Sequence, residues 1–187
     1  MKPGEKIRAL REEKKMDVAE VAQRLQLDSK QLDDIENGSL APSLGVLIKL
    51  ARVLGVRLGT FLDDQVRPGA VITRKGDADA TISLSSSESS KKENLSFFSL
   101  AKEKADRHME PFLVEIKPGV PSNPLASTHE GEEFIYVLQG SVLVTYGKEE
   151  HLLNEGDSIY LDSIVKHQLH SANNEKALLL AVVYLPV

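Results

Sequence analysis

The spacing of apolar residues changes once along this chain of 187 residues, and the change divides it into two parts. Up to about position 62 the apolar residues recur three and four positions apart, as Val18, Val21 and Leu25 do, which is the period of a helix packed on a core. From Leu95 onward the period is two, and glycines recur at strand-length intervals. We therefore expect a multidomain α plus all-β protein in which the helices come first.

Cap and turn residues divide the helical part into short segments. Asp28 or Ser29 stands where one helix would begin, and Gly38 stands where it would end. Ser43 stands before the next helix. This arrangement of cap and turn residues predicts a bundle of five helices over residues 1–64.

The rest of the chain divides into a linker and a strand-rich domain. Residues 65–94 contain Pro, Gly and the run SLSSSESSKKEN, which predicts a linker with short strands and a Ser-rich loop. Residues 95–187 show about eight to ten short strand patterns and no helix pattern, which is typical of a sandwich or barrel.

Composition excludes several kinds of site. The chain has no cysteine, so it forms no disulfide and no thiolate metal site, and a bound metal must use nitrogen and oxygen ligands. The N-terminal run MKPGEKIRALREEKK is charged and no apolar run is long enough to span a membrane, so we expect a cytoplasmic protein without membrane contact.

Residues 1–64 carry 11 basic and 11 acidic side chains, so DNA binding here would depend on local contacts and dimerisation more than on phosphate attraction.

The helical part carries a DNA-binding motif. Its segment LDSKQLDDIENGSLAPSL resembles the Cro/cI-type (XRE) helix-turn-helix family, and the resemblance extends over the whole helical part. It implies that the helix starting at Ser29 lies in the major groove with its first residues against base edges. The residues that the resemblance places at a double-stranded DNA operator are Ser29, Lys30, Gln31, Asp34 and Ser43. Arg8 and Arg11 are expected to add phosphate contacts.

Two motifs of the strand-rich part, STHEGEEFIYVLQG and GDSIYLDSIVKHQLHSAN, resemble the cupin family, and the resemblance covers roughly residues 97–187. It implies a double-stranded β-helix barrel in which His129, Glu133 and His167 converge. Two imidazoles and a carboxylate can occupy one face of an octahedron around Fe(II), and Mn, Ni, Co or Zn tolerate the same set.

A further histidine that the cupin family usually supplies is replaced here by Ser127. The site is therefore expected either to hold a divalent metal through three protein ligands or to serve as a plain ligand pocket. The residues expected to line this pocket are Ser127, Ile135 and Val137.

Two functional classes fit this arrangement. The first is a transcription regulator, similar to the XRE–cupin regulators, whose operator binding is modulated by a small-molecule effector in the barrel. The second is a non-haem iron oxygenase or epoxidase acting on a phosphonate or carboxylate, because cupin epoxidases of phosphonates share this organisation and the triad. A helical bundle used only for dimerisation or protein contact is a third alternative.

Of these classes we expect the regulator, with no catalytic residue. We also expect a homodimer through the barrels, because the strand FIYVL is apolar on both faces and its outer face needs a cover.

Overall fold

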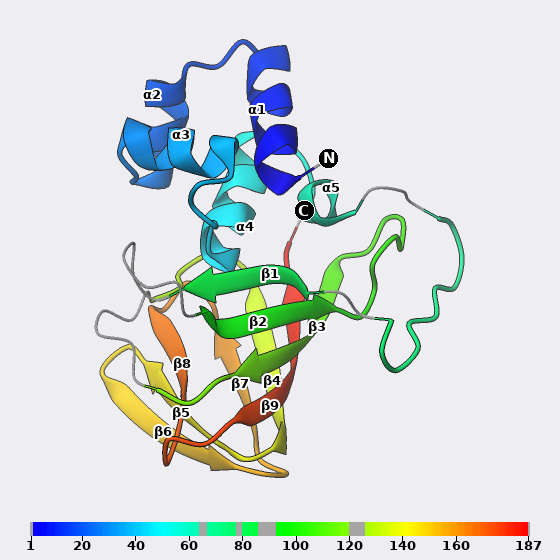
Figure 1. The fold of residues 1–187 in the computed structure, drawn as a ribbon, viewed down its shortest axis with the longest axis vertical. Coiled ribbons are helices and arrows are strands. Elements are labelled where there is room, and N and C mark those ends of the chain that lie inside the picture. The colour runs from blue at the N-terminus through cyan, green and yellow to red at the C-terminus, as the bar shows by residue number, and fades with distance from the viewer. Residues whose placement is uncertain (1, 64–66, 78–79, 86–92, 120–125, 187) are drawn as a thin grey trace.

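In a computed structural model of the chain, the described residues form a domain of five helices and, beneath it, a barrel of nine strands (Figure 1). The structure describes residues 2–63, 67–77, 80–85, 93–119 and 126–186. The helices are α1 (Pro3–Glu13), α2 (Val18–Leu25), α3 (Ser29–Asn37), α4 (Leu44–Val53) and α5 (Gly59–Leu62). The strands are β1 (Ala80–Ser85), β2 (Glu93–Ser99), β3 (Met109–Ile116), β4 (Glu132–Gln139), β5 (Ser141–Tyr146), β6 (Glu149–Asn154), β7 (Ser158–Asp162), β8 (His167–Ser171) and β9 (Ala177–Tyr184). The predicted fold class, a five-helix bundle followed by a cupin-type barrel, is confirmed.

Local caps fix both ends of α3. The Asp28 carboxylate accepts a hydrogen bond of 2.7 Å from the Gln31 backbone amide, and the Gln31 side-chain oxygen accepts one of 3.1 Å from the Asp28 amide, which together form a capping box. The helix ends at Gly38, whose φ of 76° is left-handed and suits glycine. Leu32 and Ile35 are buried in the core of the helical domain, so the opposite face of α3 is held outward.

The barrel consists of two antiparallel sheets. One has the strand order β1-β2-β3-β9-β4-β7 and the other has the order β6-β5-β8. Alternate residues of β4 are buried between the sheets, beginning with Glu133. The linker strand β1 pairs with β2 at the edge of the larger sheet, and most of the Ser-rich run, residues 86–92, lies outside the described residues.

Helix α4 packs directly on one end of the barrel. A Cβ atom at Gly45 would lie 2.9 Å from the Ser127 hydroxyl oxygen and 3.8 Å from the His129 ring. A side chain at position 45 would therefore require the Ser127 hydroxyl to rotate away, and glycine avoids this contact.

A buried ion pair joins the end of α5 to the barrel. The Arg107 guanidinium lies 2.5 Å from the Asp63 carboxylate and 2.7 Å from the Glu110 carboxylate, and all three side chains are at least nine-tenths buried. Asp63 closes the helical domain and Arg107 precedes β3, so this cluster links the two domains.

Among the described residues, no helix combines the length and the apolar character that crossing a membrane requires.

Candidate metal centre and nucleic-acid interface

The fold brings the three predicted metal ligands together at the end of the barrel that faces α4. His129 lies in the loop before β4, Glu133 lies on β4, and His167 begins β8. The two strands belong to different sheets, so the cluster joins the sheets. All three residues are buried, and one ligand atom from each lies within 4.8 Å of the others.

Hydrogen bonds to the backbone orient both imidazoles. The Nδ1 atoms of His129 and His167 lie 2.9 Å from the carbonyl oxygens of Glu130 and Val165. A carbonyl only accepts, so both Nδ1 atoms carry hydrogen and both Nε2 atoms face inward. A hydrogen bond from Nδ1 to a carbonyl fixes the tautomer that a histidine needs to bind a metal through Nε2.

The inward Nε2 atoms both meet the same carboxylate oxygen. Glu133 Oε1 lies 2.7 Å from His129 Nε2 and 3.3 Å from His167 Nε2. A neutral imidazole with its hydrogen on Nδ1 offers only a lone pair at Nε2, so each contact needs a positively charged species between two acceptors. That species is either a proton or a metal cation.

The pKa values of the cluster agree with this reading. Burial opposes ionisation of Glu133, but hydrogen bonds from His129 and His167 outweigh it and lower the pKa of the carboxyl to about 2. Burial also opposes the charged imidazole of His167, yet its hydrogen bond and attraction to Glu133 raise its pKa. The cluster therefore holds a fixed negative charge that attracts a cation.

The distances from Glu133 Oε1 to the two Nε2 atoms suit a divalent metal. Metal bonds to nitrogen and oxygen measure about 2.0–2.2 Å, so two ligands at a right angle lie roughly 3 Å apart, close to the 2.7 and 3.3 Å found here. Two imidazoles and one carboxylate on one side of an ion are the set typical of non-haem Fe(II). The chain thus has the donors for a divalent metal, which would be held by His129, Glu133 and His167.

Of the other residues predicted for the pocket, Ser127 lies beside this cluster. Ser127 pairs through its backbone with His167, with N···O distances of 2.8 and 3.0 Å, and its hydroxyl faces Gly45 of α4. A longer side chain in the same rotamer would run into α4, so the helix occupies space that a fourth imidazole would need. Ile135 and Val137 are fully buried in the barrel core.

The predicted DNA-contacting residues lie on α3, except for Ser43, which precedes α4. Ser29 and Lys30 are exposed on the first turn of α3. The Lys30 ammonium lies 2.8 Å from the Asp34 carboxylate, one turn later. Lys30 and Asp34 therefore share one face, on which the acidic group partly neutralises the basic one.

Gln31 and Ser43 both have structural partners, and the sequence indicated only that of Ser43, as a cap residue. The side-chain oxygen of Gln31 accepts from the Asp28 amide, so bidentate binding of Gln31 to adenine would require opening the capping box. The Ser43 hydroxyl accepts a hydrogen bond of 3.2 Å from the Val46 amide and caps α4. The spacing of Asp28 and Gln31, three residues apart, could have indicated the first of these.

The expectation that Arg8 and Arg11 contact phosphates is not supported by their surroundings. Both side chains bind Glu36, which is buried, with Arg11 Nε at 2.6 Å and Arg8 Nε at 3.2 Å. Hydrogen bonds and attraction to this carboxylate raise the pKa of Arg11. A buried glutamate requires such partners, so the two arginines tie α1 to α3.

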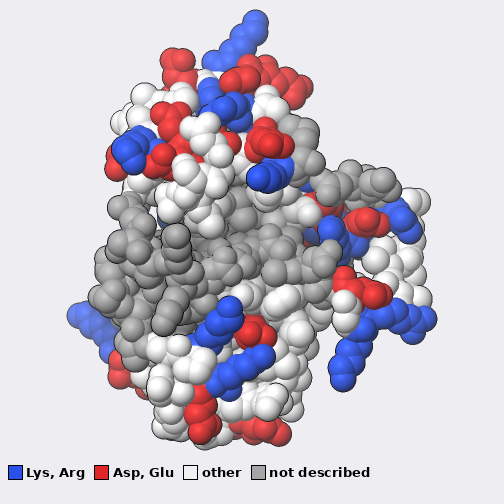
Figure 2. All heavy atoms as spheres, in the orientation of Figure 1, with Lys and Arg blue, Asp and Glu red and all other residues white. Residues whose placement is uncertain are grey.

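The surface charge of the helical domain is mixed. Figure 2 shows Lys and Arg interspersed with Asp and Glu over the helices on the face in view. Without a single-sign patch on that face, non-specific attraction to DNA is small there, and binding would depend on contacts made by α3.

Comparison with known proteins matches both domains. The helix-turn-helix family matches residues 7–61, and the cupin domain family matches residues 112–183. Over 173 residues the chain is 21% identical to the HTH-type transcriptional regulator PuuR of Escherichia coli (strain K12), which covers 91% of this chain and 88% of that protein.

Solved structures share the whole fold. A helix-turn-helix family transcriptional regulator from Vibrio cholerae has a TM-score of 0.68 at 20% identity, covering 98% of this chain and 95% of that one. Hydroxypropylphosphonic acid epoxidase from S. wedmorenis has a TM-score of 0.51 at 25% identity, covering 97% and 96%. The chain therefore carries an N-terminal XRE-type helix-turn-helix domain followed by a C-terminal cupin domain.

Proposed function

We propose that this protein is a transcription regulator that binds a double-stranded DNA operator through α3, and that a small molecule in the cupin barrel modulates this binding. The observation that carries the proposal is the exposed first turn of α3, held by a buried opposite face, in a domain fixed directly on the barrel. Similarity to PuuR along nearly the whole chain supports it. Such a regulator would act in the cytoplasm.

The operator is identified by selecting bound DNA from a random pool. We expect the full chain to enrich a two-fold symmetric sequence, because two copies would present two α3 helices. A chain lacking residues 1–64 should enrich nothing. If the full chain enriches no sequence even at low salt, or if the truncated chain binds equally well, the proposal is wrong.

Lys30→Ala is expected to weaken operator binding by roughly 1–3 kcal/mol, because an exposed lysine at the start of α3 is placed to donate to a guanine. Fluorescence anisotropy on the selected operator measures the change. Lys148→Ala, at an exposed turn of the barrel, is the matched control and should bind like the wild type. Unchanged binding by Lys30→Ala would move the base-reading role to other residues.

A homodimer through the barrels is part of the proposal. The outer face of the larger sheet carries cross-strand rows of apolar side chains, which are Phe98, Leu113, Leu180 and Tyr136 in one row and Pro111, Val182, Phe134 and Tyr160 in the next. Tyr136 is 37% exposed and Tyr160 is 64% exposed. Apolar patches of this kind mark interaction surfaces, and a second copy of the same face would cover it.

Tyr136→Glu is expected to convert the dimer to a monomer, because it places a carboxylate on the apolar face. Sedimentation velocity measures the change. Leu152→Glu is the control, since Leu152 is 55% exposed but lies on β6 of the smaller sheet. A wild-type chain that sediments as a monomer at micromolar concentration would refute the dimer.

An enzymatic role is the second candidate. It is favoured by the shared fold with hydroxypropylphosphonic acid epoxidase at 25% identity together with the His129, Glu133 and His167 cluster. Under our proposal, a metal held by these residues organises a ligand pocket without turnover. Substrate-dependent oxygen uptake by the Fe(II)-loaded chain with hydroxypropylphosphonate would favour the enzyme instead.

A further inference from the structure

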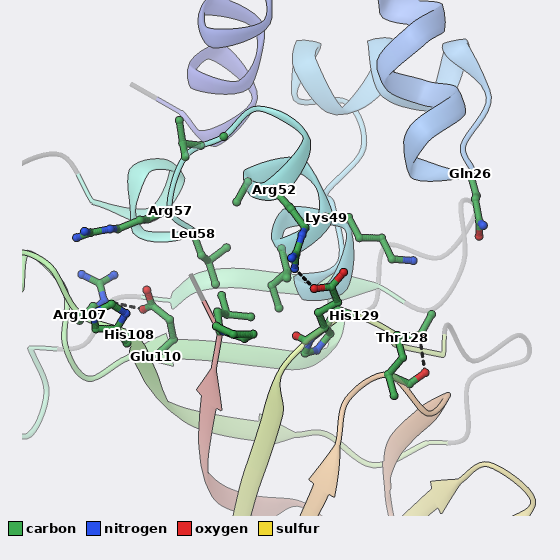
Figure 3. A pocket seen from close by; sticks show the side chains of 18 residues that line it. Gln26, Lys49, Arg52, Arg57, Leu58, Arg107, His108, Glu110, Thr128 and His129 are labelled. Atoms are coloured by element: carbon green, nitrogen blue, oxygen red, sulfur yellow. Dashed lines mark hydrogen bonds and ion pairs between the residues drawn. The ribbon is translucent and has the colours of Figure 1, made fainter.

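A cavity of about 790 Å³, which His129 of the metal cluster also lines, lies between the helical domain and the barrel (Figure 3). One wall is α4 with the turn that follows it, including Ile48, Lys49 and Leu58. The other wall comes from the barrel, with Ile164 and Leu185 among its residues. The volume lies in the range of small-molecule sites.

The cavity is lined by four cationic side chains, and three of them already have anionic partners. Arg52 pairs with Glu130, Arg57 pairs with Asp106, and Arg107 pairs with Asp63 and Glu110. These ion pairs link the two walls, and the carboxylates offset most of the charge of the arginines, although Arg107 Nη2 is buried without a hydrogen-bond partner among the described residues.

Lys49 differs from the other three. It is half-buried, and it makes no hydrogen bond or ion pair with any residue in the described part of the chain. Figure 3 shows its side chain extending from α4 between Gln26 and Thr128. A partly desolvated ammonium without a partner gains more from binding an anion than an exposed one does.

We propose that this cavity is a regulatory site for a small aliphatic monocarboxylate, with the carboxylate bound to Lys49. The aliphatic body would lie against Ile48, Leu58 and Ile164, the last of which is 64% exposed. One unpaired ammonium matches a single negative charge. A phosphate dianion would need further donors of the bidentate arginine kind, and the arginines here are paired.

The site would couple ligand binding to the position of α3. Its two walls belong to different domains, so a ligand that touches both favours the arrangement in which they meet. Lys49 lies on the helix that follows α3. The coupling rests on the proposed DNA-binding function, whereas binding of the carboxylate itself does not.

Calorimetric titration of the metal-stripped full chain, without DNA, tests the site. Hexanoate should bind, hexyl phosphate should bind more weakly, and hexylamine should not bind. Lys49→Gln should weaken hexanoate binding by roughly tenfold or more through loss of a charge-assisted hydrogen bond. Lys49→Arg should retain binding, and Lys148→Gln, at an exposed turn of the barrel, should bind like the wild type.

Each contrary outcome overturns a defined part of the proposal. No binding of hexanoate at millimolar concentration, or equal binding by Lys49→Gln, overturns the site. Tighter binding of hexyl phosphate overturns the carboxylate class. Saturating hexanoate should change the operator affinity of the wild type but not of Lys49→Gln, and an unchanged wild-type affinity overturns the coupling. Because the titration contains no DNA, failure of DNA binding would not alter its result.

Discussion

Glu133→Gln is expected to abolish divalent-metal binding by the barrel while leaving the fold intact. The amide keeps the shape of the carboxylate but removes the negative charge that both imidazoles face at 2.7 and 3.3 Å. Even changes outside the ligand set weaken metal binding roughly 10–100-fold, so loss of a ligand charge should exceed this. Titration of the chelator-stripped chain with Co(II), followed by absorbance and heat, measures the affinity.

Glu132→Gln is the matched control for this experiment. Glu132 is the preceding residue on β4, and its carboxylate accepts a hydrogen bond of 2.6 Å from the Tyr160 hydroxyl outside the cluster. Its substitution should leave Co(II) affinity unchanged. Equal Co(II) uptake by Glu133→Gln and the wild type would remove the metal assignment.

The second large effect is expected on stability. Arg107→Met should lower the free energy of unfolding by about 3–5 kcal/mol near neutral pH, because it leaves two buried carboxylates without their shared cation. The side chains of Asp63 and Glu110 are only 3% and 4% exposed, so water cannot replace the guanidinium. Urea unfolding followed by circular dichroism measures the loss.

This effect should depend on pH in a defined direction. Burial raises the pKa of Glu110 from 4.5 to about 6 against the attraction of Arg107. Between these values the folded chain binds more protons than the unfolded chain, so wild-type stability should fall by about 2 kcal/mol as pH rises through this window. The Arg107→Met deficit should be smaller at about pH 5, where Glu110 is protonated.

Glu110→Gln provides the control for the pH dependence. The neutral amide cannot titrate, so the fall in stability between about pH 4.5 and 6 should disappear in this variant. If the slope is the same as in the wild type, another group is responsible for it.

The fold could be predicted from the sequence because its main signals are local. The change of period near position 62 separates helices from strands. The residues that cap α3 directly precede and follow that helix in the sequence. The cluster of His129, Glu133 and His167 could be predicted because the resemblance to the cupin motifs supplied the arrangement of the strands. No periodicity in the sequence would bring β4 and β8 together.

Contacts across long separations could not be predicted in this way. From the sequence we expected Arg11 to contact phosphate, but the fold brings it to Glu36, 25 residues later. Arg107 and Asp63 are 44 residues apart and belong to different domains. Such pairs depend on where complete elements pack, which the spacing of neighbouring residues does not encode.

The glycine at position 45 of α4 also affects the exchange of helical domains between this protein and related proteins. A hybrid that joins a foreign helix-turn-helix head to this barrel would bring a new residue to the place where α4 meets the Ser127 hydroxyl. Even an alanine would put its methyl group 2.9 Å from that oxygen, closer than van der Waals contact allows. The Ser127 hydroxyl would then have to rotate away, or the helical domain would have to shift on the barrel. Exchange of helical domains on this barrel should therefore succeed best when the incoming domain has glycine at this position.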